Sequence, residues 1–308
     1  MSTVVQKRIE NPNSTLVICD VSPPRDYRAE ELQLCGDIGA DFVSFAYNPG
    51  KSPRVHPALA ALWLKQNTSS EPVFTLTTRD MNELAFQSLL LGLALHGLEN
   101  VVIVAGDAFT KDEASKIEPI SGSRPSRIIK SIHKMNMGLD FKGRKLDYPT
   151  NFCLGATIDL GNSLTAELEL TRRKLKAGAQ YFFVQALFDP NRLLSFIEEY
   201  ERLYNEAIEA PLFCGVQIMV QGGKSFGKIP EWVTLDLDRG RSGVDIAVQL
   251  IKKYQDIGFN SIYLIPSILN GGERDYNAAH RVIQTIKIDL LVLACCRSGC
   301  SVLFVCVI

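Results

Sequence analysis

Polar side chains that can do chemistry recur at the ends of short apolar runs in this 308-residue chain. Asp20 closes the run TLVICD and two prolines follow soon after it, while Gln185 lies within the apolar stretch YFFVQALFD. A carboxylate at such a place needs water or a charged partner, and a buried amide needs hydrogen-bond partners. Because proline fixes φ at about −65°, the prolines would stiffen the turn and hold the Asp20 carboxylate towards a ligand.

The same pattern follows most of the apolar runs and supplies carboxylates, amides and a phenol. The residues are Asp20, Tyr47, Asn48, Thr77, Thr78, Arg79, Asp80, Asp107, Asp159, Gln185 and Gln217. Several have a structural explanation when taken singly, because Asp80 or Asn82 can cap a helix and Asp107 can stabilise a turn. Their recurrence at so many run ends favours a ligand site over a bare scaffold.

Eight apolar runs of strand length must position these residues. Each run is continuously apolar rather than alternating, which is typical of parallel strands covered on both faces. The expected strands are residues 15–20, 41–47, 72–78, 100–106, 152–158, 180–186, 211–219 and 260–266.

Amphipathic stretches separate the runs, as at 81–98, 163–179 and 245–259. In 81–98, Leu84, Leu91 and Leu95 recur at helical spacing. Glycines end these stretches before the next run, which is typical of helix C-caps. Two connections, 107–151 and 220–259, are long, and long loops on such a scaffold usually build or cover a site.

Eight strand–helix units predict a single-domain α/β protein, a (β/α)8 TIM barrel. The alternative is a doubly wound open sheet, which would place a phosphate-binding glycine turn after the first strand. The first turn here reads DVSPPR and has no glycine. In a barrel the carboxyl ends of all strands meet at one mouth, so the polar residues above would share one site.

The composition of the chain argues against nucleic acid and membranes as binding partners. The net charge is −1, so no general field would attract nucleic acid or a membrane surface. The polar N-terminus MSTVVQKRIENPNS is not a secretory signal, and the irregularly spaced cysteines are typical of a reduced, cytoplasmic protein. His56, His96, His133 and His280 fall away from the strand ends, so we expect no metal site.

We expect three regions along the chain: an N-terminal extension 1–13, the barrel 14–288, and an apolar, cysteine-rich tail 289–308. Arg297, Ser298 and Gly299 split that tail into two apolar pieces. Each piece is too short to span a bilayer, which takes about 20 apolar residues. No role is assigned to the tail.

Four segments resemble the methylenetetrahydrofolate reductase family: CDVSPPR, TLTTRDMNELAFQSLLLGLALHGLENVVIVAGD, TRRKLKAGAQYFFVQALFD and IPEWV. The resemblance covers about residues 14–288 and is greatest to the bacterial branch that also occurs fused to homocysteine methyltransferases. It implies a TIM-barrel flavoprotein in one-carbon and methionine metabolism. With NAD(P)H as co-substrate, hydride would pass through N5 of FAD in a ping-pong reaction that converts 5,10-methylenetetrahydrofolate to 5-methyltetrahydrofolate.

The resemblance also implies roles for single residues. Asp20 matches the catalytic general acid, while Asp107, Gln185 and Gln217 are expected to bind the folate. The residues expected to contact FAD are Tyr47, Thr77, Asp107, Glu167 and Lys174.

The chain departs from the family at several of these places. Asp20 replaces the family's glutamate and is one methylene shorter, and Ala46, Phe74 and Ala105 replace polar residues of some relatives. These changes leave open a second hypothesis, in which a divergent folate- or flavin-binding barrel acts as a subunit or carrier. A homo-oligomer is expected, and a partner methyltransferase or electron-transfer subunit is an additional hypothesis.

Overall fold

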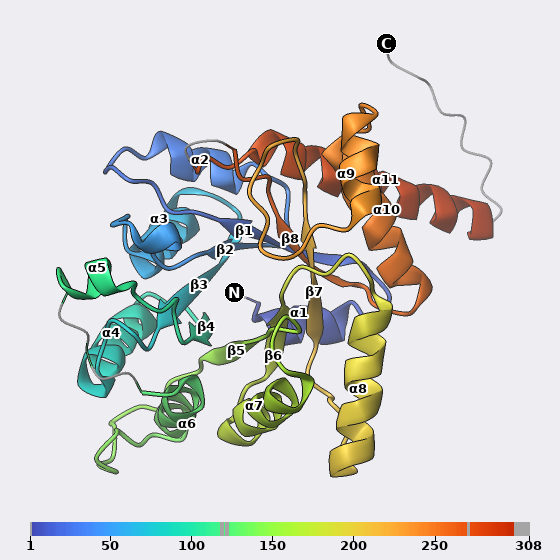
Figure 1. Cartoon of the computed structure of the whole chain (residues 1–308). Helices are drawn as coiled ribbons and strands as arrows, with labels where there is room; N and C mark the ends of the chain where they lie inside the picture. Colours follow the sequence, from blue (N-terminus) through green and yellow to red (C-terminus); the bar gives the residue numbers. More distant parts are fainter. Residues whose placement is uncertain (1, 118–119, 121–122, 270–271, 299–308) are drawn as a thin grey trace.

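The computed structural model describes residues 2–117, 120, 123–269 and 272–298, with side chains up to residue 288. Eight parallel strands form a closed barrel in the order β1 to β8, and β8 pairs with β1 (Figure 1). The strands are β1 (Leu16–Val21), β2 (Phe42–Phe45), β3 (Glu71–Thr77), β4 (Asn100–Val104), β5 (Cys153–Ile158), β6 (Tyr181–Val184), β7 (Leu212–Gln217) and β8 (Ser261–Ile265). All eight predicted runs are therefore strands, and the (β/α)8 prediction is confirmed.

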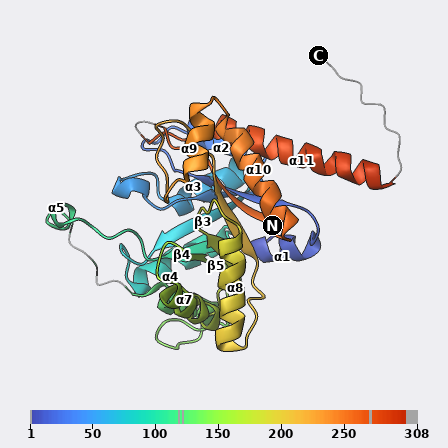
Figure 2. The same cartoon turned by 45° about the vertical axis from the view of Figure 1, so that its right-hand side comes forward.

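Most of the helices surround the barrel on its outer face, whereas the first helix packs at one end of it (Figures 1 and 2). The helices are α1 (Val4–Glu10), α2 (Glu30–Gly36), α3 (Pro57–Asn67), α4 (Glu83–Leu95), α5 (Lys111–Ala114), α6 (Pro125–Asn136), α7 (Leu164–Ala177), α8 (Asn191–Tyr204), α9 (Glu231–Asp238), α10 (Gly243–Asp256) and α11 (Tyr276–Ser298), with a 3-10 turn η1 (Pro49–Lys51). The two long connections carry α5 with α6 and α9 with α10.

Within the described chain, the core has three apolar clusters, of which the smallest joins Met219, Val233 and Ile246. The largest lies between the strands and the helices. The second fills the barrel interior with side chains such as Ile18, Phe42, Val73 and Phe213, and it includes the fully buried Val4 of α1. Val4 also donates its backbone N–H to the Asn100 side chain. The short helix within the expected extension 1–13 thus packs against the barrel interior.

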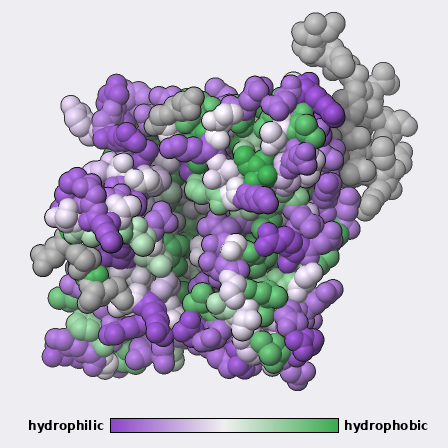
Figure 3. All heavy atoms as spheres, in the orientation of Figure 1, coloured by the Kyte–Doolittle hydropathy of each residue, from purple (hydrophilic) through white to green (hydrophobic). Residues whose placement is uncertain are grey.

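The leucines that recur at helical spacing in 81–98 lie on the outer face of α4. Leu84 and Leu95 are 62% and 87% exposed, whereas Phe86, Leu90 and Leu93 pack against the strands. Leucine is abundant all round this helix, so periodicity alone did not distinguish its two faces. The surface seen in Figure 3 is largely hydrophilic, with apolar residues in small groups.

The C-terminal part of α11 extends beyond the other helices in both views (Figures 1 and 2). The predicted tail 289–308 lies only partly within the described chain, since α11 runs to Ser298 and residues 299–308 fall outside the description. Among the described helices, none has the length and apolar character needed to cross a membrane.

Candidate functional site

A cavity of about 210 Å³ opens at the carboxyl ends of the strands. Of the eight residues given a role by the resemblance, five line it together, namely Asp20, Tyr47, Thr77, Asp107 and Gln185, and the strand-end residues Asn48 and Arg79 line it too. The five come from β1, β3 and the segments that follow β2, β4 and β6. The fold therefore brings the polar strand ends to one mouth, as barrel geometry requires.

Asp20 is the most constrained acid of the mouth and is only 5% exposed. Tyr263 of β8 donates its hydroxyl to Oδ1 at 2.7 Å, and Arg274 donates Nη2 to Oδ2 at 2.9 Å. Burial raises the pKa of the Asp20 carboxyl, while Arg274 and then the Tyr263 hydrogen bond oppose that rise. The carboxyl is thus held in place with a proton affinity above that of a free aspartate.

Sequence reasoning missed both partners of Asp20, and both also line the cavity. Tyr263 lies inside the apolar run 260–266, where an aromatic residue is typical of any strand. Arg274 lies in the segment between β8 and α11. A signal for Tyr263 was available, because alternate residues of a barrel strand face the interior and Tyr263 is in register with Ile18 of β1.

Arg274 also joins Asp20 to the loops above the mouth. Its guanidinium donates to Ser22 Oγ at 3.2 Å and to the Pro266 carbonyl at 3.2 Å, and it lies 5.7 Å from the ring of Phe226. Antiparallel bridges join Ile268 to Arg274 and to Lys224. The loops after β7 and β8 therefore form one connected cover beside Asp20.

Gln217 holds this cover and does not line the cavity. Its amide donates to the Lys224 carbonyl at 2.8 Å and accepts from the Phe226 N–H at 3.0 Å. The side chain is 2% exposed, so both of its bonds are made to its own loop. Its geometry fits a residue that positions Phe226 at the mouth.

A second wall of the cavity, at the ends of β3 and β4, is built around Arg79. Its guanidinium forms two hydrogen bonds to Asp80 at 2.7 and 2.6 Å, donates to the Asp107 carbonyl at 3.0 Å, and lies 4.4 Å from the Phe109 ring. Thr77 donates to the same Asp80 carboxylate at 3.2 Å. Asp80 is thus a partner of Arg79 and Thr77, whereas Asn82 is the residue that caps α4.

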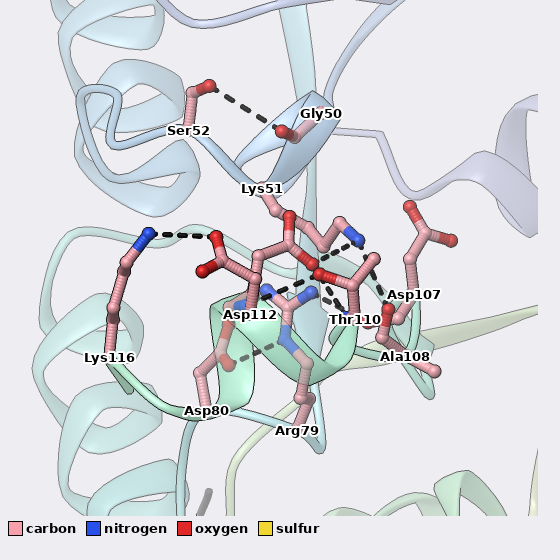
Figure 4. Close-up of polar contacts among 11 residues, drawn as sticks. Gly50, Lys51, Ser52, Arg79, Asp80, Asp107, Ala108, Thr110, Asp112 and Lys116 are labelled. Atoms are coloured by element: carbon pink, nitrogen blue, oxygen red, sulfur yellow. Dashed lines mark hydrogen bonds and ion pairs between the residues drawn. The ribbon is translucent and has the colours of Figure 1, made fainter. Parts of the chain in front are cut away.

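Lys51 ties the loop after β2 to the loop after β4 across this wall (Figure 4). Its ammonium lies 2.6 Å from Glu113 and 3.2 Å from the Ala108 carbonyl. Glu113 also accepts the Thr110 N–H, which completes a capping box on α5. These hydrogen bonds, led by that from Lys51, hold the pKa of the Glu113 carboxyl at about 2. The ion pair keeps the two loops together beside the cavity.

Glu167 and Lys174, which the resemblance predicts to contact FAD, lie on the inner face of α7 and are nearly buried. Lys174 Nζ donates to the Thr157 carbonyl at 2.5 Å and lies 3.4 Å from Glu167. Burial lowers the pKa of the Lys174 ammonium, and Glu167 opposes the shift. Thr157 lines the cavity, so Lys174 is hydrogen-bonded to a residue of the cavity wall without lining the cavity itself.

Within the described residues, no group of three histidine, cysteine, aspartate or glutamate side chains is arranged to hold a metal ion. The mouth instead offers hydroxyls, amides, carboxylates and two guanidinium groups. Such a set binds an organic molecule through hydrogen bonds, and Asp20 adds a group that can hold a proton.

Comparison with known proteins agrees with this architecture. The family model for methylenetetrahydrofolate reductase matches residues 5–265. A solved structure from Clostridium thermocellum, described as an uncharacterized protein that binds two copies of 5-methyl-5,6,7,8-tetrahydrofolic acid, superposes with a TM-score of 0.65 at 15% identity. The superposition covers 93% of this chain and 100% of that one. The comparison with curated proteins found no match. The family match spans nearly all of the barrel, and the chain belongs to the methylenetetrahydrofolate reductase family.

Proposed function

We propose that this chain reduces 5,10-methylenetetrahydrofolate to 5-methyltetrahydrofolate, with FAD as its cofactor and NAD(P)H as the electron donor. The observation that carries the proposal is the buried Asp20 carboxyl, which is anchored at the mouth in a cavity that also contains Gln185 and Asp107. Family membership supports the reaction class. The folate found in the structurally similar Clostridium thermocellum protein supports the class of substrate.

The residues at the mouth fit the ring system of a flavin. Thr77, Asp107 and Gln185 offer hydroxyl, carboxylate and amide groups to one cavity, and Tyr47 adds an aromatic wall. Gly106 has φ +83°, and a Cβ there would lie 3.2 Å from the Cβ atoms of Thr77 and Arg79, so glycine keeps this floor of the mouth open. When bound, FAD would supply hydride transfer, which no protein side chain can perform.

Asp20 would act as the general acid. Reduction of the bridging carbon requires the five-membered ring of the folate to open, and the nitrogen that leaves must receive a proton. Asp20 faces the cavity, and burial favours its protonated form. The residue is shorter than the family's glutamate, but two side chains fix both of its oxygens at the cavity wall.

The other chain residues would bind and orient. The Gln185 amide can donate to and accept from a pterin edge, which displays both kinds of group. The Asp107 carboxylate can accept hydrogen bonds from the ring N–H and amino groups. We place Glu167 and Lys174 beneath the cofactor, where Lys174 reaches the mouth through the Thr157 carbonyl. Gln217 would act indirectly, through the loop that carries Phe226.

Purification followed by a visible spectrum and two half-reactions tests the proposal. The protein should be yellow or become so with added FAD, its absorbance should bleach with NADH or NADPH, and methylenetetrahydrofolate should restore the colour. Folate binding measured by calorimetry without any NAD(P)H oxidation would instead support a carrier or subunit. Failure to bind either FAD or a folate would refute both functions.

A further inference from the structure

The two oxygens of Asp20 have chemically different partners. Oδ2 receives an N–H of Arg274 at 2.9 Å, and Oδ1 receives the hydroxyl of Tyr263 at 2.7 Å. A guanidinium has only hydrogen-bond donors, whereas a phenol hydroxyl can donate or accept. A proton on Oδ2 would face an N–H of Arg274, which cannot accept a hydrogen bond. A proton on Oδ1 is tolerated, because the Tyr263 hydroxyl can rotate away from it.

We propose that Tyr263 is a positioning residue that makes Oδ1 of Asp20 the proton-bearing oxygen and holds it at the cavity. The proposal rests on the function proposed above. In the acid state the Tyr263 hydroxyl turns away from Oδ1, and the Oδ1 proton is available to the leaving nitrogen of the folate. After the N–H bond forms and the O–H bond breaks, Tyr263 donates to the new carboxylate, which solvent later reprotonates.

The surroundings of Tyr263 fix its ring while leaving its hydroxyl free to rotate. The ring stacks on Phe183 with a centroid distance of 4.3 Å and an interplanar angle of 12°. Phe183 in turn meets Tyr181 and Phe213 edge-on, at centroid distances of 5.6 and 6.2 Å. This aromatic stack inside the barrel sets where the hydroxyl lies, so the Asp20 carboxyl cannot swing away from the mouth.

The charged and titratable groups around the pair are few. Arg274 faces Asp20 from the segment before α11, Cys19 adjoins it on β1, and Tyr276 approaches from the start of α11. Burial, and next the charge of Asp20, raises the pKa of Tyr263 well above its usual range. The phenol therefore keeps its proton, and the group that titrates in this pair is Asp20.

The test compares Tyr263→Phe with Tyr181→Phe. Both changes remove one phenol hydroxyl from the same aromatic stack, but the Tyr181 hydroxyl is fully buried and has no hydrogen-bond partner among the described residues. One readout is the pH titration of the ¹³C-labelled Asp20 carboxyl by NMR, assigned by its absence in Asp20→Asn. The other is the pH dependence of the folate half-reaction, followed by flavin reoxidation.

Tyr263→Phe should raise the pKa of Asp20 by about one unit or more, because it removes a hydrogen bond to the ionised form. It should also slow the folate half-reaction about tenfold at low pH, while Tyr181→Phe changes neither quantity. An unchanged Asp20 titration in a folded Tyr263→Phe protein would overturn the proposal, whatever the loss of rate. If the wild-type chain proves to lack reductase activity, the NMR titration still decides the role of Tyr263.

Incorporation of 3-fluorotyrosine provides a second route should Tyr263→Phe fail to fold. Fluorination makes the phenol a stronger donor, so the pKa of Asp20 should fall. An Asp20 titration identical to that of the unlabelled protein would count against the hydrogen bond and hence against the proposal.

Discussion

Arg274 and Asp20 form a buried ion pair of 2.9 Å between residues separated by 254 positions, and their side chains are only 4% and 7% exposed. The pair joins the end of the first strand to the segment beyond the last one. Because the barrel closes between β1 and β8, the proposed acid is held at the seam of the fold.

Removing the cation of this pair should be costly. Arg274→Met leaves a buried carboxylate unpaired, and we expect a loss of about 3–5 kcal/mol in the free energy of unfolding at neutral pH, measured with urea. Arg274 lowers the pKa of Asp20, so its loss raises that pKa further. A group whose pKa is raised on folding stabilises the protein at low pH and loses that effect as the pH rises through its folded pKa. The deficit should therefore grow as the pH rises above about 4. Lys116→Met, which breaks a pair with 69% and 77% exposed side chains, is the control and should cost about 1 kcal/mol or less.

Asp20→Asn should separate the two half-reactions. An amide cannot donate the proton of an acid, so reduction of the folate should slow by about 10²–10⁴-fold. Reduction of the flavin by NAD(P)H needs no proton from Asp20 and should retain most of its rate. Stopped-flow absorbance measures both steps, and an equal loss in the two would assign Asp20 a purely structural role.

Lys174→Met should destabilise the protein by about 3–5 kcal/mol, since it leaves Glu167 as a charge that is 2% exposed. The double variant Lys174→Met/Glu167→Leu should recover much of this loss, as measured by urea unfolding. Flavin titration of the double variant then tests the cofactor role. A stable double variant that binds FAD as the wild type does would contradict a contact between these residues and the cofactor.

The ion pair between Lys51 and Glu113 should respond to acid. The pKa of the Glu113 carboxyl is held at about 2, below its ordinary value of 4.5. Its stabilisation is therefore complete above about pH 4.5 and is lost as the pH falls towards 2. Lys51→Met should be less stable than the wild type at pH 7, and the difference should shrink below pH 4. A difference that stays constant between pH 7 and pH 2.5 would exclude this origin.

Two glycine-to-alanine changes should have opposite effects on stability. A Cβ on Gly215 of β7 would lie 2.3 Å from the Val184 carbonyl oxygen, and backbone atoms cannot give way cheaply. Gly215→Ala should therefore cost about 3 kcal/mol and displace the neighbouring Gln185. Gly92 lies within α4 with nothing within 4 Å of such a Cβ. Gly92→Ala should add about 1 kcal/mol, and thermal unfolding of both variants checks the pair.

The strands and the mouth could be predicted from the sequence because both depend on local patterns. Continuous apolar runs are typical of parallel strands, and closure of the barrel brings their carboxyl ends together. Asp20, Thr77 and Gln185 were found by position alone, as polar residues at the ends of such runs.

The partners of those residues could not be predicted in the same way. Arg274 resembles any loop arginine until the barrel places it beside Asp20, and Gln217 resembles a ligand-binding amide until its loop is seen to use both of its polar atoms. The buried face of α4 could not be told from its exposed face either, because leucine occurs on all sides of that helix. The contact that decides the role of Arg274 lies 254 residues away in the sequence, and that of Gln217 depends on how its own loop folds back.

The seam between β1 and β8 also affects the order in which the protein can fold. Asp20 is made early during synthesis, but Tyr263 and Arg274 follow 243 and 254 residues later. Contacts of such long range form late, after the intervening chain has been synthesised and ordered. Until then the Asp20 carboxylate must stay hydrated, so a nascent chain lacking β8 cannot bury its first strand completely. The acid site therefore cannot be assembled before the first and last parts of the barrel meet.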